Sequence, residues 1–310
     1  MITALIGILI GTGLSIQTAV NSQLRKFVIS PYLASMISFV IGALFLTVIS
    51  LVIGSPLGIS WKLIGNEPAW IWLGGVLGVI FLTVNILLFP KLGSVQTAIM
   101  PILGQIIMGM LIDNFGWFHS MRKAFDSYRL IGICLVLVGV FFAIAIQEVR
   151  HRQEKNKGND LYLWIWRIIG VVSGMLMSMQ VAINGQLGVV LDSSIQAAFV
   201  SFVVGALTLI IVVGVKERSF VKVSNPIKQK APWWVWLGGF LGAAYVLINI
   251  YLVGQVGTGQ TVVLVLFGQI AGSLLIQRFG WMGSQKTQVD WIQIIGLIMI
   301  LAGVILIRMF

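Results

Sequence analysis

Amide side chains recur at helical spacing inside long apolar stretches of this sequence. Gln17 and Asn21 stand four residues apart, and the pair is repeated as Gln180 and Asn184. Residues four apart lie on the same face of a helix. An amide in apolar surroundings needs a hydrogen-bonding partner, which is either another helix or a polar solute in a cavity. Both interpretations stay open for these four residues.

A second set of candidate residues combines an aromatic ring with an amide. Phe81 precedes Asn85 by four residues, and Tyr245 precedes Asn249 in the same way. Each pair shares about one third of the helical circumference. The change from Phe81 to Tyr245 is expected where a symmetric cavity meets an asymmetric ligand, although ordinary packing explains it equally well.

The elements that carry these residues are membrane-spanning helices. Of the 310 residues 58% are hydrophobic and 9% charged, and the mean hydropathy is +1.02, outside the range of a soluble domain. A helix crosses a bilayer with about 20 apolar residues, and backbone in lipid must be helical. We therefore predict an all-α integral membrane protein with ten crossings, near residues 3–24, 31–53, 69–89, 94–112, 128–147, 162–187, 195–215, 233–253, 258–277 and 291–309.

The sequence contains an internal repeat. The segment from Ser15 to Leu24 recurs from Ser178 to Leu187 at an offset of 163, and after one inserted residue the match continues. Identical polar, glycine and tryptophan positions at a fixed offset indicate duplication rather than shared hydrophobicity. Further matched segments are residues 38–44 with 201–207, 70–75 with 234–239, 104–105 with 268–269, and 115–117 with 279–281.

Each repeat holds five predicted crossings. We assign residues 1–150 to the first repeat, 151–161 to a charged linker and 162–310 to the second repeat. Because five is odd, the second copy must enter the membrane from the side where the first copy left. The two repeats are therefore inverted, which relates them by a pseudo-twofold axis in the membrane plane and places a shared site between them.

Gln105 and Gln269 occupy equivalent places near the middle of the fourth and ninth predicted crossings. This is the depth at which inverted-repeat transporters bind their ligand. Pro101, one turn before Gln105, is expected to loosen that helix for gating or to produce a simple packing kink. We predict a cavity lined by amides and aromatic rings from the first, third, fourth, sixth, eighth and ninth crossings.

The acidic residues all fall at or beyond the ends of the predicted helices. Asp113 is the nearest to a cavity, and we expect it at the membrane interface because Gln277 takes its place in the second repeat. His119 and His151 lie in loops without metal spacing, and no nucleophile triad or phosphate loop is present in the sequence. We therefore expect no enzyme activity, no cofactor, no metal site and no nucleic-acid partner, and a neutral or zwitterionic solute in preference to a cation.

The chain resembles the YdcZ-like proteins of the drug/metabolite transporter (DMT) superfamily, in the form that fuses two five-helix units. The resemblance covers the whole chain and rests on the repeated SxQxxxNxQL run, the tryptophan-led GG segments, the GQ pairs and the FGW segments. It implies a transporter fold with both termini in the cytoplasm. Most Lys and Arg residues instead follow odd-numbered helices, which puts those loops in the cytoplasm and the termini outside.

We expect a multi-pass secondary transporter of the plasma (inner) membrane that moves a small polar or amphipathic metabolite by alternating access. Its partners are that solute and the membrane lipids. The fusion of two units favours a self-sufficient monomer, and a homodimer stays open. Two alternatives are a lipid flippase or scramblase, which needs a lateral polar groove, and a non-transporting membrane scaffold, which needs no cavity.

Overall fold

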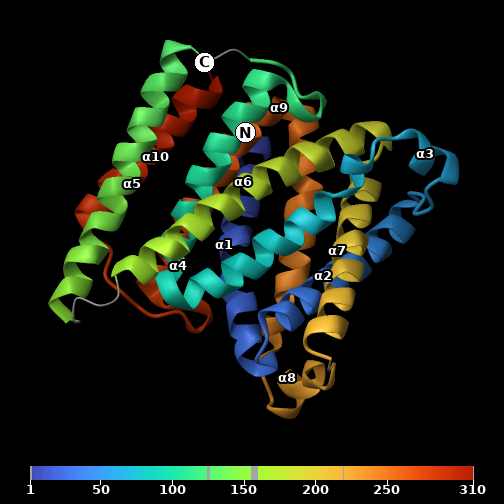
Figure 1. Ribbon diagram of the computed structural model, residues 1–310, viewed down its shortest axis with the longest axis horizontal. Helices are drawn as coiled ribbons and strands as arrows, with labels where there is room; N and C mark the ends of the chain where they lie inside the picture. Colours follow the sequence, from blue (N-terminus) through green and yellow to red (C-terminus); the bar gives the residue numbers. More distant parts are fainter. Residues whose placement is uncertain (1, 124–125, 155–159, 219, 310) are drawn as a thin grey trace.

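The chain forms a helical bundle with short connections (Figure 1). The computed structural model describes residues 2–123, 126–154, 160–218 and 220–309, so residues 155–159 of the expected linker lie outside the described residues. No strand occurs within these ranges. The α-helices are α1 Ile2–Val28, α2 Pro31–Ile53, α3 Trp61–Asn66, α4 Gly74–Phe115, α5 Ser127–Glu154, α6 Asp160–Val190, α7 Ser194–Lys216, α8 Asn225–Lys228, α9 Leu237–Phe279 and α10 Trp291–Met309.

The helix ends follow local sequence signals. Ser30 caps α2 by accepting a hydrogen bond from the main-chain N–H of Leu33, and Pro31 takes the first helical position, where its missing N–H costs nothing. Gly54 ends this helix in the left-handed conformation, with φ of 74°. In the second repeat Ser193 caps α7 in the same way as Ser30 caps α2. The repeat therefore preserves capping as well as hydrophobicity.

Two predicted crossings are joined into α4 without a loop. Gly93, with φ of 75° and ψ of 175°, interrupts the helical backbone between them. Only glycine adopts this region readily, so Gly93 allows the chain to bend sharply between two helical arms (Figure 1). The helical dihedral angles continue through Pro101, so the proline does not break the second arm.

The described helices accommodate all ten predicted crossings. Seven helical stretches are long and apolar enough to span a membrane, and one of them, Gly74–Phe115, holds two predicted crossings. Shorter apolar helices at Ser127–Ala143 and Trp291–Ile307 supply the remaining two. The prediction of an all-α, ten-helix membrane protein is confirmed.

Reciprocal contacts between the repeats show the pseudo-twofold symmetry. A Cβ added to Gly11 of α1 would stand 2.0 Å from the main-chain oxygen of Val265 on α9. A Cβ added to the equivalent Gly174 of α6 would stand 1.9 Å from that of Pro101 on α4. Each half therefore lays its first helix against the fourth crossing of the other half, and this close approach requires glycine.

The helices nearest the axis pack against their own counterparts. Gly132 of α5 faces Gly303 of α10, while Gly139 faces Gly296, so the two helices run antiparallel, side by side (Figure 1). The rings of Phe39 on α2 and Phe202 on α7 lie 5.0 Å apart between centroids. An equivalent pair meeting at one point is the geometry of an isologous contact. The inverted arrangement thus brings α1, α4, α6 and α9 together at the centre of the protein.

Candidate functional site

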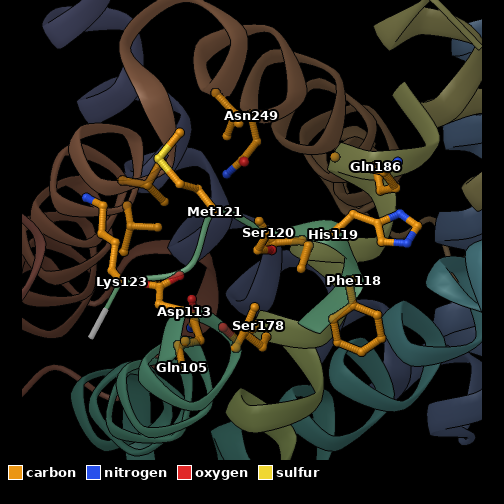
Figure 2. Close-up of a pocket in the computed structure, with 18 of the residues that line it drawn as sticks. Gln105, Asp113, Phe118, His119, Ser120, Met121, Lys123, Ser178, Gln186 and Asn249 are labelled. Carbon is orange, nitrogen blue, oxygen red and sulfur yellow. The ribbon is translucent and has the colours of Figure 1, made fainter. Parts of the chain in front are cut away.

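A large cavity lies between the two repeats and has a volume of about 560 Å³. Its walls come from the second arm of α4, from α6, from α9 and from the segment that follows α4 (Figure 2). At its outer end it reaches Met121 and Val189, which are 81% and 73% exposed. A space of this size accommodates a metabolite-sized molecule.

Three of the predicted binding residues line this cavity, namely Gln105, Tyr245 and Asn249. All three are buried in the protein. The side-chain amide of Asn249 donates to the hydroxyl of Tyr245 over 3.3 Å, which holds both groups at the wall. Within the described part of the chain, the Nε2 of Gln105 has no hydrogen-bonding partner. An unpaired buried donor beside a cavity is available for a polar ligand.

Two other predicted residues, Asn85 and Gln269, line a second cavity of only about 10 Å³, roughly the least that one water molecule needs. The Oδ1 of Asn85 and the Oε1 of Gln269 find no partner among the residues described. These two amides are the repeat counterparts of Asn249 and Gln105. The four central amides therefore divide between a large cavity and a small one.

The remaining predicted residues line neither of these two cavities. Asn21 accepts a hydrogen bond of 2.6 Å from the Ser38 hydroxyl, and Asn184 donates one of 3.2 Å to Ser201. Gln17 and Gln180 contact the glycines at 242 and 78, and Phe81 belongs to the main hydrophobic cluster. In this conformation all five pack between helices, but Nδ2 of Asn21, Oε1 of Gln180 and Oδ1 of Asn184 have no hydrogen-bonding partner among the described residues. Their role in binding therefore stays a prediction.

The small cavity is the repeat counterpart of the large one. Ser15, Thr18 and Phe89 line the former, and their equivalents Ser178, Val181 and Val253 line the latter. The same correspondence holds for Ala98, Gln269, Ser273 and Ile276 with Val262, Gln105, Gly109 and Ile112. One pseudo-symmetric space is thus present twice, once expanded and once collapsed.

A small hydrophobic cluster closes the collapsed side. Ala19, Phe89 and Ile276 are buried together, with Ile16 and Met282 packed against them. We call these five residues the closed gate. Beside them the amide of Gln23 donates to the main-chain oxygen of Gly283 over 2.8 Å, which ties α1 to the segment after α9.

The equivalents of the closed gate stand apart on the expanded side. Four of the five equivalents, Ile112, Phe118, Ala182 and Val253, line the large cavity, whereas Met179, the equivalent of Ile16, does not. We call these four residues the open gate, and Gln186, the counterpart of Gln23, lines the cavity beside them. Figure 2 places Phe118 and His119 on the side of the cavity near Gln186. The residues that could close this mouth are therefore present but separated by empty space.

The large cavity contains charged side chains that the prediction of a wall of amides and aromatic rings did not include. Asp113, His119, Lys123 and Arg129 all contribute to the wall of the large cavity. Lys123 reaches it because its main-chain N–H bonds the oxygen of Asp113 over 2.8 Å, which folds the segment after α4 back over the mouth. A sequence signal for Asp113 and Arg129 is present, because the repeats differ at both positions. Gln277 and Gln293 take their places in the second repeat.

Basic residues also lie deeper than we expected from their positions near helix ends. Arg167 of α6 is 3% exposed, its Nε donates to Gln96 over 3.2 Å, and its guanidinium lies 4.8 Å from the ring centre of Trp164. An amide and an aromatic face stabilise a cation that has left water. This residue lines neither of the two cavities, so we assign it to helix packing.

The cavity walls provide groups that can bind a solute. In the portion of the chain that the structure describes, no three His, Cys, Asp or Glu residues group closely enough to hold a metal ion. Cys134, the single cysteine, is exposed and lies outside both cavities. The arrangement offers hydrogen-bond donors and acceptors, one charged mouth and apolar walls to a solute.

The fold is shared with a solved structure. A crystal structure of a protein that is 14% identical matches 99% of this chain and 96% of its own chain, with a TM-score of 0.64. At this identity the likeness shows the fold alone. No curated protein gives a significant match.

The sequence also matches a family profile twice, over residues 2–142 and 165–306. These two ranges follow the two repeats, and together they cover most of the chain. The profile is described as "Putative inner membrane exporter, YdcZ". The resemblance drawn from the repeated motifs is confirmed: the chain belongs to the YdcZ family of the DMT superfamily, in its two-unit form, and is a multi-pass membrane transporter.

Proposed function

We propose that this transporter moves a small amphipathic metabolite by alternating access, exposing one central site to each side of the membrane in turn. The observation that carries the proposal is the unequal pair of equivalent cavities, about 560 Å³ on one side and about 10 Å³ on the other. A pseudo-symmetric protein in which one half of the path is open and the other shut has an obvious second state, namely the exchange of the two.

The two gates supply the contacts for that exchange. The closed gate holds three buried residues together, and one hydrogen bond from Gln23 accompanies it. On the other side Gln186 is positioned like Gln23, with His119 in the place of Gly283. Closing the open gate would therefore rebuild the same set of contacts that now shuts the opposite mouth.

The central amides support a solute that is partly polar. Gln105 on the open side and Asn85 and Gln269 on the collapsed side each carry a buried, unpartnered polar atom within the described chain. A ligand that satisfies such groups gains the free energy that they lose by burial. The apolar wall residues, among them Val253, provide for the rest of the molecule.

Matched single-cysteine variants test the mechanism without knowledge of the substrate. Ile112→Cys and Ile276→Cys, each in a Cys134→Ala background, place a thiol at equivalent positions of the open and the closed gate. In sealed proteoliposomes of uniform orientation, a membrane-impermeant maleimide should label the thiol at position 112 from one side only. The thiol at position 276 should react more slowly and from the opposite side only. Its rate reports how often the protein visits the exchanged state.

Other functions give other labelling patterns. A channel would let both positions react from the same side at once, and a scaffold without transport would leave the thiol at position 276 unreactive from either side. A lipid flippase or scramblase would move a fluorescent phospholipid across the same vesicles. Either of the first two patterns, or lipid movement that labelling of the Ile112→Cys variant blocks, would refute alternating access of a small solute.

A further inference from the structure

The mouth of the large cavity contains a buried guanidinium that has no role in the gates described above. Arg129 is 2% exposed and lines the cavity near the start of α5. Its Nη1 donates to the main-chain oxygen of Lys123 over 3.1 Å, and its main-chain N–H donates to Asp126 over 2.9 Å. Its Nε finds no hydrogen-bonding partner in the described parts of the chain. A buried charged donor left unpaired is expensive, so this position favours an incoming acceptor.

The charged side chains that line this mouth are two basic residues and one acidic residue, and the Asp126 carboxylate lies beside them, hydrogen-bonded to the main-chain N–H of Arg129. Arg129 and Lys123 are basic, Asp113 is acidic, and His119 completes the polar wall. Figure 2 shows Lys123, Asp113 and Gln105 on the same side of the cavity, at the left of the view. The two basic side chains favour an anion, and the nearby carboxylates of Asp113 and Asp126 disfavour a second negative charge, so the mouth suits a singly charged anion better than a multiply charged phosphate.

At the equivalent mouth of the other repeat, uncharged side chains occupy the places of Asp113, Lys123 and Arg129. Gln277 and Gln293 occupy the places of Asp113 and Arg129, and their side chains exchange hydrogen bonds of 3.3 and 3.4 Å. Both are buried, and Thr287 replaces Lys123. The fold can therefore be completed here by an amide pair, so bundle formation alone does not require the arginine.

Most of the remaining wall is apolar. Aliphatic side chains from α4, α6 and α9 face the cavity, including Ile112, Val181, Val253, Val262 and Leu266. A solute that fills such a space gains from burying an apolar body of its own. The mouth and the wall together describe an amphipathic molecule with a charged head.

We infer that Arg129 is the recognition residue for the anionic head group, a carboxylate by charge and shape, of a small amphipathic solute. The inference rests on the proposed function and names the substrate class of the same site. The planar guanidinium offers parallel N–H groups to two carboxylate oxygens, which an ammonium does not. The apolar body of the solute then extends toward Gln105 and the valines of α9.

Charged thiol reagents test this inference directly. Ser178 lines the cavity on α6, so Ser178→Cys in the Cys134→Ala background places a reporter there. The probes are the sulfonatoethyl, trimethylammonioethyl and methyl methanethiosulfonates, in which the sulfonate stands in for the carboxylate. The measured quantity is the ratio of the labelling rate of the anionic reagent to that of the cationic reagent, each normalised to its rate with free cysteine. This ratio should exceed one. It should fall about tenfold in Arg129→Gln, because the loss of one charge acts through a dielectric constant between those of protein and water.

Matched variants separate the charge at this site from general effects. Arg122→Gln removes an exposed arginine that bonds Asn114 outside the cavity and should leave the ratio unchanged. Because Arg129→Gln alone could fail to fold, Asp113→Gln is compared with Asp113→Gln/Arg129→Gln, which copies the native Gln277 and Gln293 pair. The ratio should fall about tenfold between these two variants as well. Arg129→Lys keeps the positive charge and should therefore retain most of the rate ratio, which reports charge.

Each outcome decides one of the two proposals. A ratio near one in the reporter that retains Arg129, or a ratio that Arg129→Gln leaves intact, would overturn the recognition role and leave alternating access standing. Failure of the uncharged methyl reagent to reach the thiol at position 178 would instead show that the central cavity is absent, and the proposed function would fall with it.

Discussion

Gly174 on α6 is a position where one added methyl group should separate two helices. Its Cβ would stand 1.9 Å from the main-chain oxygen of Pro101 on α4, and observed Cβ contacts essentially never fall below 3.0 Å. The helices would have to move apart by roughly 1 Å, at a place where close-packed backbone cannot rearrange locally. Overpacking of this kind costs about 1–3 kcal/mol.

Gly185 on the same helix provides the matched control, because a Cβ added there meets no atom within 4 Å. Alanine is preferred over glycine inside a helix by about 1 kcal/mol, and this gain is common to both substitutions. The difference between Gly174→Ala and Gly185→Ala therefore isolates the clash. We expect Gly174→Ala to be the less stable of the two by about 1–3 kcal/mol.

Unfolding in mixed micelles with increasing SDS, followed by tryptophan fluorescence, measures this difference. The equivalent Gly11→Ala on α1, where the clash is with the main-chain oxygen of Val265 at 2.0 Å, should lose as much as Gly174→Ala. Equal stability of the alanine variants at 174 and 185 would refute the claim that backbone contact between α4 and α6 holds the repeats together.

Four further substitutions test three individual features of the fold. Asn21→Ala and Ser38→Ala should each lower the free energy of unfolding by about 1 kcal/mol, because both remove the same 2.6 Å hydrogen bond. The double variant should lose no more than one of the single variants, and SDS unfolding of the three variants measures these differences. Tyr245→Phe should lose less than about 1.5 kcal/mol in the same assay, since it removes only the hydrogen bond to Asn249 and phenylalanine occupies the equivalent position 81. Gly93→Ala should lose about 1–3 kcal/mol in the same assay from backbone strain alone, because its Cβ would meet no neighbour. An alanine variant as stable as the native protein would argue against strain at this site.

The architecture was accessible from sequence because its determinants are local or repeated. Ten apolar runs predict ten crossings, and the recurrence of Ser15–Leu24 in the second half predicts the duplication. The odd number of crossings per repeat then determines the inversion without any knowledge of contacts. What the pattern could not show is that Gly93 joins two crossings without a loop, since a single glycine in an apolar run has several explanations.

The site was only partly accessible, because the role of each amide depends on its distant neighbours. Gln105 and Asn249 line the cavity, whereas Asn21 is occupied by Ser38 and packs against Gly238, 217 positions along the chain. Nothing near Asn21 in the sequence distinguishes it from Asn249. Arg129 was missed for the opposite reason: it lies in the first turn of a helix, where a basic residue is ordinarily explained by the membrane surface.

Under the proposed alternating access, the difference between the two mouths predicts which conformation the protein adopts at rest. Closing the mouth that contains Arg129 would confine its charge, with those of Lys123 and Asp113, in a smaller space away from water, and that costs free energy. The opposite mouth, with its paired Gln277 and Gln293, closes without this cost. The protein should therefore rest with the charged mouth open, and an anion bound at Arg129 would offset the penalty for closing it. In the proposed mechanism, charge would couple the binding of the carboxylate to the change of conformation, because a ligand shifts such an equilibrium only as far as it favours one state over the other.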